Sequence, residues 1–480
     1  MRVLENIKPE RVFYYFEEIS KIPRGSGNTK EISDYCVNFA KKHGYIVSQD
    51  NMNNVIIKKN ASPGRECDAG VIIQGHLDMV CEKVNESQHD FFKDGIELLI
   101  EDGFITANGT TLGADDGIAI AFALAILEDT QISHPNLEVI FTVDEEIGMY
   151  GAEAIDLSEI KGKYLLNLDC DMDGIAFAGC AGGIRTDVFF DYTKEHVASK
   201  AYEIVVTGLK GGHSGSEIDK ERANSNIVLG RLLRKLDKSI SFNIVSLNGG
   251  TKDNVITRES KAVITTEDEA VLISLIDEYN EIIKNEYAVT DENIIVKLNV
   301  LESKKYEVID NTAKENIIFF MNIVPNGAIN YCGDMKGLVE TSLNMGVLET
   351  NESNVKIGIS IRSLIRSKKQ LILDKLLYLA ERAGARTEVY GNYPEWEYNR
   401  NSKLQQVFKE TYKKLFDEEL EISVIHAGLE CGYLLDKKKD LDIISFGPQM
   451  YDIHTPDERV SIESTRKAYE LVLEVLKNLK

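Results

Sequence analysis

Short apolar runs in the first part of the chain alternate with segments whose apolar positions recur at helical spacing. Runs at residues 55–57, 71–73, 137–143 and 164–168 are rich in β-branched and other apolar side chains, which predicts buried strands. Residues 116–127 carry almost no polar side chain, which predicts a helix buried in a core. Strands that alternate with helices predict an α/β domain with a mostly parallel central sheet.

A second pattern begins after the glycine-rich residues 179–183 and ends near residue 400. It predicts strands at 201–207, 241–247, 261–266 and 354–362, and amphipathic helices, one of which has Val228, Leu232 and Leu236 on one face. From about residue 401 the first pattern returns, with a helix at 404–415, a strand at 441–446 and a long amphipathic helix at the end. We therefore predict one domain formed by residues 1–183 and 401–480, interrupted by an inserted α+β domain of residues 184–400.

The composition agrees with two domains and excludes some partners. A chain of 480 residues is too long for one ordinary core. The formal charge of −23 disfavours a nucleic-acid partner, which would favour a basic surface. No apolar run reaches the roughly 18 residues of a membrane span, and the first residues lack the apolar core of a signal peptide. The seven scattered cysteines contain no CxxC pair, which predicts reduced thiols and a cytoplasmic protein.

Acidic residues and histidines recur where the apolar runs of the first domain end. They are His76, Asp78, Asp115, Glu145, Glu146, Asp169 and His454. Because the carboxyl ends of parallel strands meet at one edge of a sheet, we expect these side chains to gather there. Two divalent ions held close together need roughly three protein ligands each, one of them shared. Histidine and carboxylate ligands together suit zinc, with manganese or cobalt as alternatives.

Each of these residues also has an ordinary structural interpretation. His76 alone could be a core histidine, Asp115 a helix N-cap, and the run at 144–146 a solvated loop. Asp169 could be a turn-forming aspartate, and His454 an exposed loop histidine. Their recurrence at the same place in successive predicted strands favours a hydrolytic metal site over separate, unrelated causes.

Two carboxylates in the set suit tasks other than ligation. Asp78 stands two residues from His76, where a carboxylate can hydrogen-bond the free ring nitrogen of a ligand histidine. Glu145 and Glu146 are neighbours after a strand, so one can bind metal while the other accepts a proton from an attacking water. A partly desolvated cleft would raise the pKa of such a base toward the working pH.

Eight segments, in order from one end of the chain to the other, resemble the dinuclear-zinc exopeptidase family of aminoacylases, carboxypeptidase G-type enzymes and dipeptidases. The likeness is greatest to the aminoacyl-histidine dipeptidase branch. The segments are residues 74–80 (QGHLDMV), 111–117 (TLGADDG), 144–149 (DEEIGM), 166–169 (LNLD), 209–215 (LKGGHSG), 340–344 (ETSLN), 426–432 (HAGLECG) and 453–456 (IHTP). The resemblance implies a catalytic α/β domain interrupted by a lid domain, in agreement with the inserted domain inferred above.

The resemblance also implies which residues would hold the metal. His76, Asp115 and Asp169 would bind one zinc ion. Asp115, Glu146 and His454 would bind the other, so that Asp115 bridges the pair. Of the remaining members, Asp78 would orient His76, and Glu145 would be the general base.

Further residues become candidates through the same resemblance. His213 would stabilise the developing oxyanion, in its own or a neighbouring subunit's active site; taken alone it would be a turn histidine. Arg362 could bind the substrate's carboxylate bidentately, although by itself it would be a surface arginine. Asn254 resembles a residue of a substrate-binding loop, but Thr257 stands where relatives often have proline, which predicts a less rigid loop. Glu430 is a candidate for the substrate's amino terminus.

We therefore predict a metal-dependent hydrolase of dipeptides, including Xaa-His dipeptides such as carnosine and other unblocked dipeptides. Two divalent ions would activate the attacking water, and the family allows a homodimer through the inserted domain. One alternative is an N-acyl-amino-acid amidohydrolase with the same metals. The other is a non-catalytic metal- or peptide-binding protein, which the intact set of ligands and base disfavours.

Overall fold

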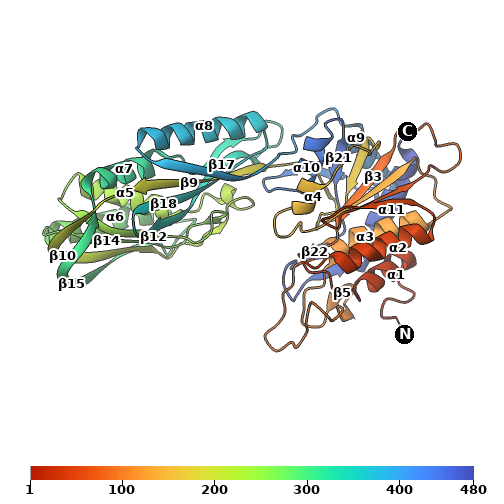
Figure 1. The fold of residues 1–480 in the computed structure, drawn as a ribbon, viewed down its shortest axis with the longest axis horizontal. Coiled ribbons are helices and arrows are strands. Elements are labelled where there is room, and N and C mark those ends of the chain that lie inside the picture. Colours follow the sequence, from red (N-terminus) through yellow and green to blue (C-terminus); the bar gives the residue numbers. More distant parts are fainter. Residues whose placement is uncertain (1) are drawn as a thin grey trace. The chain divides into compact units, whose positions relative to one another are not determined.

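The computed structural model describes residues 2–480, which fold into two compact units (Figure 1). Unit 1 is formed by the chain up to Cys180 together with Tyr398–Val424 and Leu429–Lys480. Unit 2 is formed by Ala181–Glu397 and the short segment Ile425–Gly428. In sequence, unit 2 therefore interrupts unit 1. No helix of the described residues is long and apolar enough to cross a membrane.

Unit 1 is built on an eight-stranded sheet with the order β1-β2-β6-β3-β7-β21-β8-β20. Its strands are β1 (Ile46–Gln49), β2 (Val55–Lys59), β3 (Val71–His76), β6 (Leu137–Thr142), β7 (Tyr164–Asn167), β8 (Ile175–Cys180), β20 (Glu421–Ile425) and β21 (Asp442–Ser445). The central neighbours β6, β3, β7 and β21 are parallel, and the pairs β1–β2, β2–β6 and β21–β8 are antiparallel. The predicted α/β fold with a parallel centre is confirmed.

The helices of unit 1 cover this sheet. They are α1 (Glu10–Ile19), α2 (Lys30–Lys42), α3 (Ala114–Glu128), α4 (Tyr150–Ala154), α9 (Lys403–Phe416), α10 (Glu430–Lys437) and α11 (Ile462–Asn478). The helix α3 is apolar all round because it packs against β3 on one side and α1 on the other. Ser402 and Ser461 cap the N-termini of α9 and α11 by accepting a main-chain N–H with the side chain.

A small four-stranded sheet in unit 1 was not predicted. It joins β22 (Met450–Tyr451), β23 (Arg459–Ser461), β5 (Phe104–Ala107) and β4 (Leu98–Glu101) in that order. Such short strands leave little alternation of polar and apolar residues to detect. The sheet matters for the site because the segment that carries His454 connects β22 to β23.

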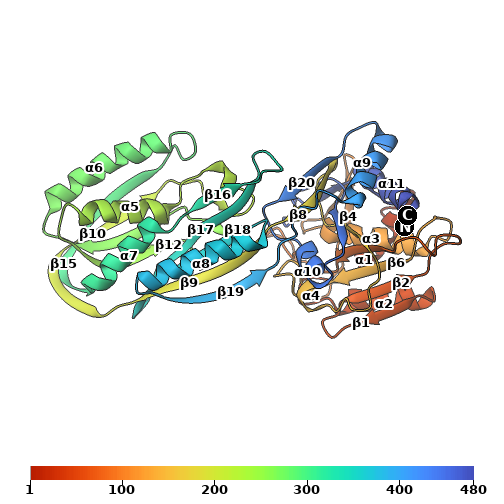
Figure 2. The same ribbon diagram turned by 90° about the horizontal axis from the view of Figure 1, so that it is seen from above.

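Unit 2 is an α+β unit with a nine-stranded sheet. Eight strands follow the order β15-β10-β14-β12-β17-β18-β9-β19, and β16 pairs with β17. They are β9 (Gly182–Asp191), β10 (Lys194–Thr207), β12 (Asn243–Gly249), β14 (Ser260–Thr265), β15 (Ile295–Ile309), β16 (Gly327–Tyr331), β17 (Val339–Thr350), β18 (Asn354–Ser363) and β19 (Arg386–Tyr393). Helices α5 (Ser225–Asp237), α6 (Glu269–Glu286), α7 (Asn311–Ile323) and α8 (Arg366–Arg382) pack across the strands (Figure 2).

One strand of unit 2 is much longer than its apolar pattern predicts. The prediction covered residues 201–207, whereas β10 begins at Lys194. Its first half pairs only with β15, and most side chains there are exposed. Residues that are solvated on both faces show no alternation of apolar and polar positions. The sequence pattern therefore does not reveal the first half of β10.

Candidate metal centre

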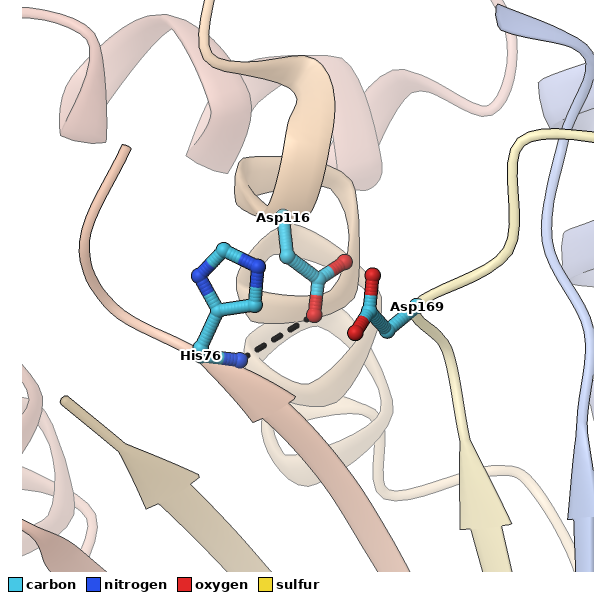
Figure 3. A group of neighbouring side chains, drawn as sticks. All are labelled: His76, Asp116 and Asp169. Carbon is cyan, nitrogen blue, oxygen red and sulfur yellow. Dashed lines mark hydrogen bonds between the residues drawn. The ribbon is translucent and has the colours of Figure 1, made fainter. Parts of the chain in front are cut away.

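Three parallel strands bring the first candidate residues to one edge of the unit 1 sheet. In the register of the sheet, His76 is opposite Thr142 of β6, and Gln74 is opposite Asn167 of β7. The residues that follow β6 and β7 therefore leave the sheet at the edge where His76 ends β3. Figure 3 shows His76 and Asp169 at neighbouring strand ends, with Asp116 reaching between them from α3.

Asp115 lies between the two histidines. Its Oδ1 is 3.1 Å from Nε2 of His76, and its Oδ2 is 3.2 Å from Nε2 of His454. Two ligand atoms bound to one tetrahedral ion at about 2.1 Å each lie about 3.4 Å apart. The spacing on both sides of Asp115 is thus close to that of ligand pairs, and each oxygen faces a different histidine.

Among residues 2–480, three groups of ligand atoms lie close enough together to hold an ion. Their members, whose atoms are all within 4.8 Å of one another, are Asp115, Glu146 and His454; His76, Asp116 and Asp169; and His76, Glu145 and Glu146. The first group matches one predicted ligand set. The second contains Asp116 where the prediction has Asp115. Oε2 of Glu146 lies 3.1 Å from Nε2 of His454.

Asp116 has a different environment from its neighbour. Its Oδ2 accepts the main-chain N–H of His76 at 3.1 Å. Burial, reinforced by the charges of Asp169 and Asp115, raises the pKa of Asp116 well above its usual range. Both aspartates have non-helical backbone angles and α3 has Gly113 as its N-cap residue, so neither acts as the simple helix cap considered from the sequence. Asp116 thus supports the end of β3 through this hydrogen bond.

Asp78 organises the loop that carries the two glutamates. Nδ1 of His76 is 3.1 Å from the main-chain oxygen of Asp78 and 3.5 Å from its Oδ1. The carboxylate accepts the N–H groups of Glu145 at 3.1 Å and Glu146 at 3.3 Å, and the Ser26 hydroxyl at 2.8 Å. The predicted contact with the His76 ring is therefore made mainly through the carbonyl, while the carboxylate fixes the position of the glutamates.

Glu145 is a half-buried carboxyl among other acids. Burial, together with the charges of Glu430, Glu146 and Asp115, raises the pKa of Glu145 to about 8. Cations bound at the neighbouring ligands would oppose this shift because they stabilise the ionised form. A carboxyl tuned in this way can accept and return a proton near neutral pH.

The turns around the site explain why some neighbouring acids lie outside it. Asp144 has a left-handed backbone, with φ of 55°, and its side chain accepts the N–H of Gly27 at 2.7 Å. It is a turn residue. His454 also has a left-handed backbone, with φ of 64°, which only a well-held segment maintains in a residue with a Cβ.

Glu430 opens α10 in unit 1 and is completely buried. Its Oε2 accepts hydrogen bonds from Nε2 of Gln74 and Oγ1 of Thr142, both at 2.6 Å. Within residues 2–480 its other oxygen has no hydrogen-bond partner. Burial raises its pKa to about 7. The group is completely buried beside Gln74 of β3 and Thr142 of β6, so a substrate ammonium would reach it only if neighbouring side chains moved.

In unit 2, the glycine-rich loop fixes the ring of His213. Nδ1 accepts the N–H groups of Gly215 at 3.3 Å and Ser216 at 3.2 Å. The pKa of His213 is lowered by burial and by the charge of Arg362. The neutral ring that accepts at Nδ1 carries its proton on Nε2, which leaves an N–H available as a donor.

Arg362 belongs to a second polar group in unit 2, which includes a residue that sequence analysis left without a role. Arg362 lies on β18 and its Nη1 donates to the hydroxyl of Tyr393 at 2.7 Å. His426 is buried, with Nε2 2.8 Å from Oγ of Ser342. Burial, with the charges of Arg362 and His213, lowers the pKa of His426 to about 3. His426 was visible in the segment at 426–432, but nothing in its spacing indicated a partner.

The loop that contains Asn254 is anchored at Thr257. The main-chain oxygen of Asn254 accepts the N–H of Ser214 at 2.9 Å, so the loop supports the turn of His213. Oγ1 of Thr257 donates to the carbonyl of Gly346 at 3.0 Å, and Thr257 is buried. Thr257 thus holds the loop through its hydroxyl.

A cavity of about 760 Å³ in unit 1 adjoins Glu146. Its apolar walls are formed by Met79, Val80, Phe91, Phe92 and Ile147, and polar side chains of the segment from Cys81 to Asp90 complete it. Phe92 is 78% exposed and Ile147 54% exposed. Apolar side chains of this size on an open cavity next to a reactive group are typical of a ligand pocket.

Comparison with known proteins defines the class. A model of peptidase family M20/M25/M40 matches residues 72–478, and the chain belongs to this family. It is an enzyme, a metallopeptidase. The resemblance inferred from the eight segments is confirmed.

Individual relatives cover the whole chain. The cytosol non-specific dipeptidase of Escherichia coli (strain K12) is 38% identical over 483 residues, which span 100% of this chain and 99% of the relative. The crystal structure of aminoacylhistidine dipeptidase from Vibrio alginolyticus is similar with a TM-score of 0.94 and 35% identity, over 99% of this chain and 98% of that one. Aminopeptidase PepT of Bacillus cereus shares the fold, with a TM-score of 0.58 and 18% identity over 98% of this chain and 99% of that one.

Proposed function

We propose that this protein hydrolyses unblocked dipeptides in a metal-dependent reaction, with Xaa-His dipeptides among its substrates. Membership of a metallopeptidase family supports the reaction, and similarity over the whole length to two dipeptidases supports the substrate class. The observation that carries the proposal is that the two oxygens of Asp115 face His76 and His454 separately. A carboxylate shared in this way suits a pair of divalent ions.

The proposed ligand sets are those that the family resemblance implies, and the group of Asp115, Glu146 and His454 agrees with one of them. His76, Asp115 and Asp169 would hold one ion, and Asp115, Glu146 and His454 the other. Zinc suits this mixture of imidazole and carboxylate, and manganese or cobalt are alternatives. Ions bound there would polarise the scissile carbonyl and lower the pKa of a water molecule.

Glu145 is the proposed general base. Its carboxylate takes the proton of the attacking water and then gives it to the nitrogen of the leaving amine. Its burial among other carboxylates, which raises its pKa, supports this assignment. Asp78 is the proposed positioning residue, since it holds the main chain of Glu145 and Glu146 and contacts the ring of His76.

Unit 2 supplies the proposed substrate contacts. The Nε2–H of His213 would donate to the developing oxyanion, in its own or a neighbouring subunit's site, a proposal supported by the acceptor role of its Nδ1. Arg362 would bind the substrate's carboxylate. Asn254 would support the loop that contacts substrate, and Glu430 of unit 1 would receive the amino terminus.

The two units have proposed roles of their own. Unit 1, near the predicted residues 1–183 and 401–480, would be the catalytic domain, and unit 2, near residues 184–400, would be the lid and the surface of a homodimer. The cytoplasm is the proposed location, supported by the cytosolic relative.

The cavity beside Glu146 would take the side chain of the substrate's N-terminal residue. It lies in the unit that holds the proposed base and ligands, whereas the carboxylate of the substrate is assigned to Arg362 of unit 2. Its open rim of Phe92 and Ile147 would accept side chains of different size. Breadth at this position is what a dipeptidase with many substrates needs.

A hydrolysis panel tests the function. Carnosine, other Xaa-His dipeptides, general dipeptides with varied N-terminal residues and N-acyl amino acids are each assayed with zinc, manganese, cobalt or chelator. We expect unblocked dipeptides to be cleaved, with large apolar N-terminal side chains tolerated, and chelation to stop the reaction. Preference for N-acyl amino acids would instead identify an amidohydrolase. Absence of turnover with every metal would favour a non-catalytic binding protein.

A further inference from the structure

The carboxylate of Glu458 accepts hydrogen bonds from the main chain of the loop at residues 112–115. The residue is 2% exposed and lies between β22 and β23. Oε2 accepts the N–H groups of Leu112 at 2.8 Å and Gly113 at 3.0 Å. Oε1 accepts those of Ala114 at 2.8 Å and Asp115 at 3.3 Å. One side chain thus satisfies the amides of four consecutive residues that lead into Asp115.

The carbonyl side of this loop is held by Arg24, which is also buried. Its Nη2 donates to the carbonyl of Gly113, and its Nη1 donates to the carbonyls of Leu77 and Asp78 at 3.0 Å each. The guanidinium therefore joins the loop to the end of β3. A Cβ on Gly113 would lie 2.6 Å from Nη2, and the φ of Gly113 is 67°, so the position requires glycine.

Glu458 belongs to the segment that also carries His454. Its own N–H donates to the carbonyl of Thr455 at 3.1 Å, and its carbonyl accepts the hydroxyl of Thr106 on β5 at 2.9 Å. The small four-stranded sheet therefore fixes the main chain of Glu458. The same segment presents one histidine to the Oδ2 of Asp115 and one carboxylate to the main chain of Asp115.

We propose that Glu458 is a positioning residue of the metal centre: it holds the loop of residues 112–115 so that the two oxygens of Asp115 face His76 and His454. The inference rests on the proposed function in one respect, since it assumes that Asp115 binds metal. Partners that orient metal ligands typically contribute a factor of 10 to 100 in metal affinity.

The four hydrogen bonds to the Glu458 carboxylate explain why this position needs a glutamate. Four donors converge on Glu458, and a carboxylate offers two oxygens that each accept two of them. The amide of a glutamine has one oxygen, so its NH2 group would face two main-chain N–H donors. Buried donors left without an acceptor cost free energy, and the loop would have to shift to reach water.

The test compares metal affinity with folding in the full-length chain. Zinc dissociation constants are measured by competition with a chromophoric chelator for the wild type, Glu458→Gln and Asp457→Asn. Asp457 is exposed and adjacent, so its variant controls for the loss of a charge in this segment. Thermal unfolding of the metal-free proteins is measured in parallel. We expect zinc to bind Glu458→Gln about 10- to 100-fold more weakly, and Asp457→Asn to bind as the wild type does.

Wild-type zinc affinity in Glu458→Gln would overturn the proposal, whatever happens to its thermal stability. If this variant does not fold, hydrogen exchange of the metal-free wild type decides instead. Protection of the amides of residues 112–115 from exchange supports the proposal that Glu458 holds this loop. Exchange of these amides at the rate of an unstructured peptide overturns the proposal. A wild type that binds zinc but hydrolyses no dipeptide would refute the proposed function and leave the positioning of Asp115 standing.

Discussion

The pKa values of the neighbouring acids Asp115 and Asp116 shift in opposite directions because their hydrogen-bond partners differ. Burial alone would raise the pKa of Asp115, but hydrogen bonds from His454 and His76 lower it. The Asp116 carboxylate accepts only the main-chain N–H of His76 among the described residues, and burial raises its pKa. The sequence shows two adjacent aspartates and cannot distinguish them, since the difference depends on the backbone turn that separates their side chains. The set at the strand ends could be predicted; the division of roles at 115–116 could not.

Removal of the general base is the most direct test at a single residue. Glu145→Gln keeps the size of the side chain and its main-chain hydrogen bond to Asp78. We expect the variant to retain its bound metal while kcat falls by about 10²- to 10⁴-fold, because only proton transfer is lost. Metal content and kcat are measured on the same sample, with Asp144→Asn as the control in the adjacent turn. Turnover at the parental rate would show that another group is the base.

The proposed contact between Arg362 and the substrate's carboxylate can be tested by comparing free and amidated dipeptides. Arg362→Met should raise KM for free dipeptides by about 10- to 100-fold, since a charged hydrogen bond of about 1.5–3 kcal/mol is lost. Dipeptides with an amidated C-terminus should be affected much less. The measurement is kcat/KM for matched free and amidated substrates. An equal loss for both would mean that Arg362 supports the fold of unit 2 rather than the substrate's carboxylate.

At the scale of helices and strands, the predictions succeeded best in the buried centre of unit 1. The fully buried strands β3, β6 and β7 and the buried helix α3 have strong apolar patterns, and each was predicted close to its observed place. The short strands around residues 98–107 and 450–461 have weak patterns and were missed. As a result Glu458, which depends on that small sheet for its position, escaped notice although it lies four residues after His454.

The buried His426, which is paired with Ser342 of β17, predicts that the stability of unit 2 depends on pH. His426 has a pKa of about 3 in the folded protein because burial, Arg362 and His213 disfavour its charged form. An unfolded chain binds this proton below about pH 6.5, so the stabilisation is complete above that pH and is lost as the pH falls toward 3. At pH 5 the loss is on the order of 2 kcal/mol.

Urea unfolding of the wild type and His426→Gln between pH 7.5 and pH 5 measures this effect. The wild type should lose more stability over the interval than the variant does. If the two proteins have parallel pH profiles, then His426 is not held in its neutral form.

For the whole molecule, the family and the α/β fold with a mostly parallel central sheet agree between sequence, structure and relatives. The distant position of His454 in the sequence is meaningful only because the chain returns to unit 1 after unit 2, and there His454 meets Asp115 and Glu146. Two ions sharing Asp115 would therefore tie the first and last parts of unit 1 together. Metal binding should stabilise unit 1 as well as enable catalysis.

The number of ions bound per chain, with and without Asp115, tests the central claim most directly. Metal-free wild type and Asp115→Asn are titrated with zinc, and bound metal is determined together with hydrolysis of an Xaa-His dipeptide. We expect the wild type to bind two ions and regain activity, and Asp115→Asn to lose high-affinity binding at both sites because the shared ligand is gone. An Asp115→Asn protein that still binds two ions with wild-type affinity, or a wild type that is fully active in excess chelator, would contradict the shared-carboxylate centre.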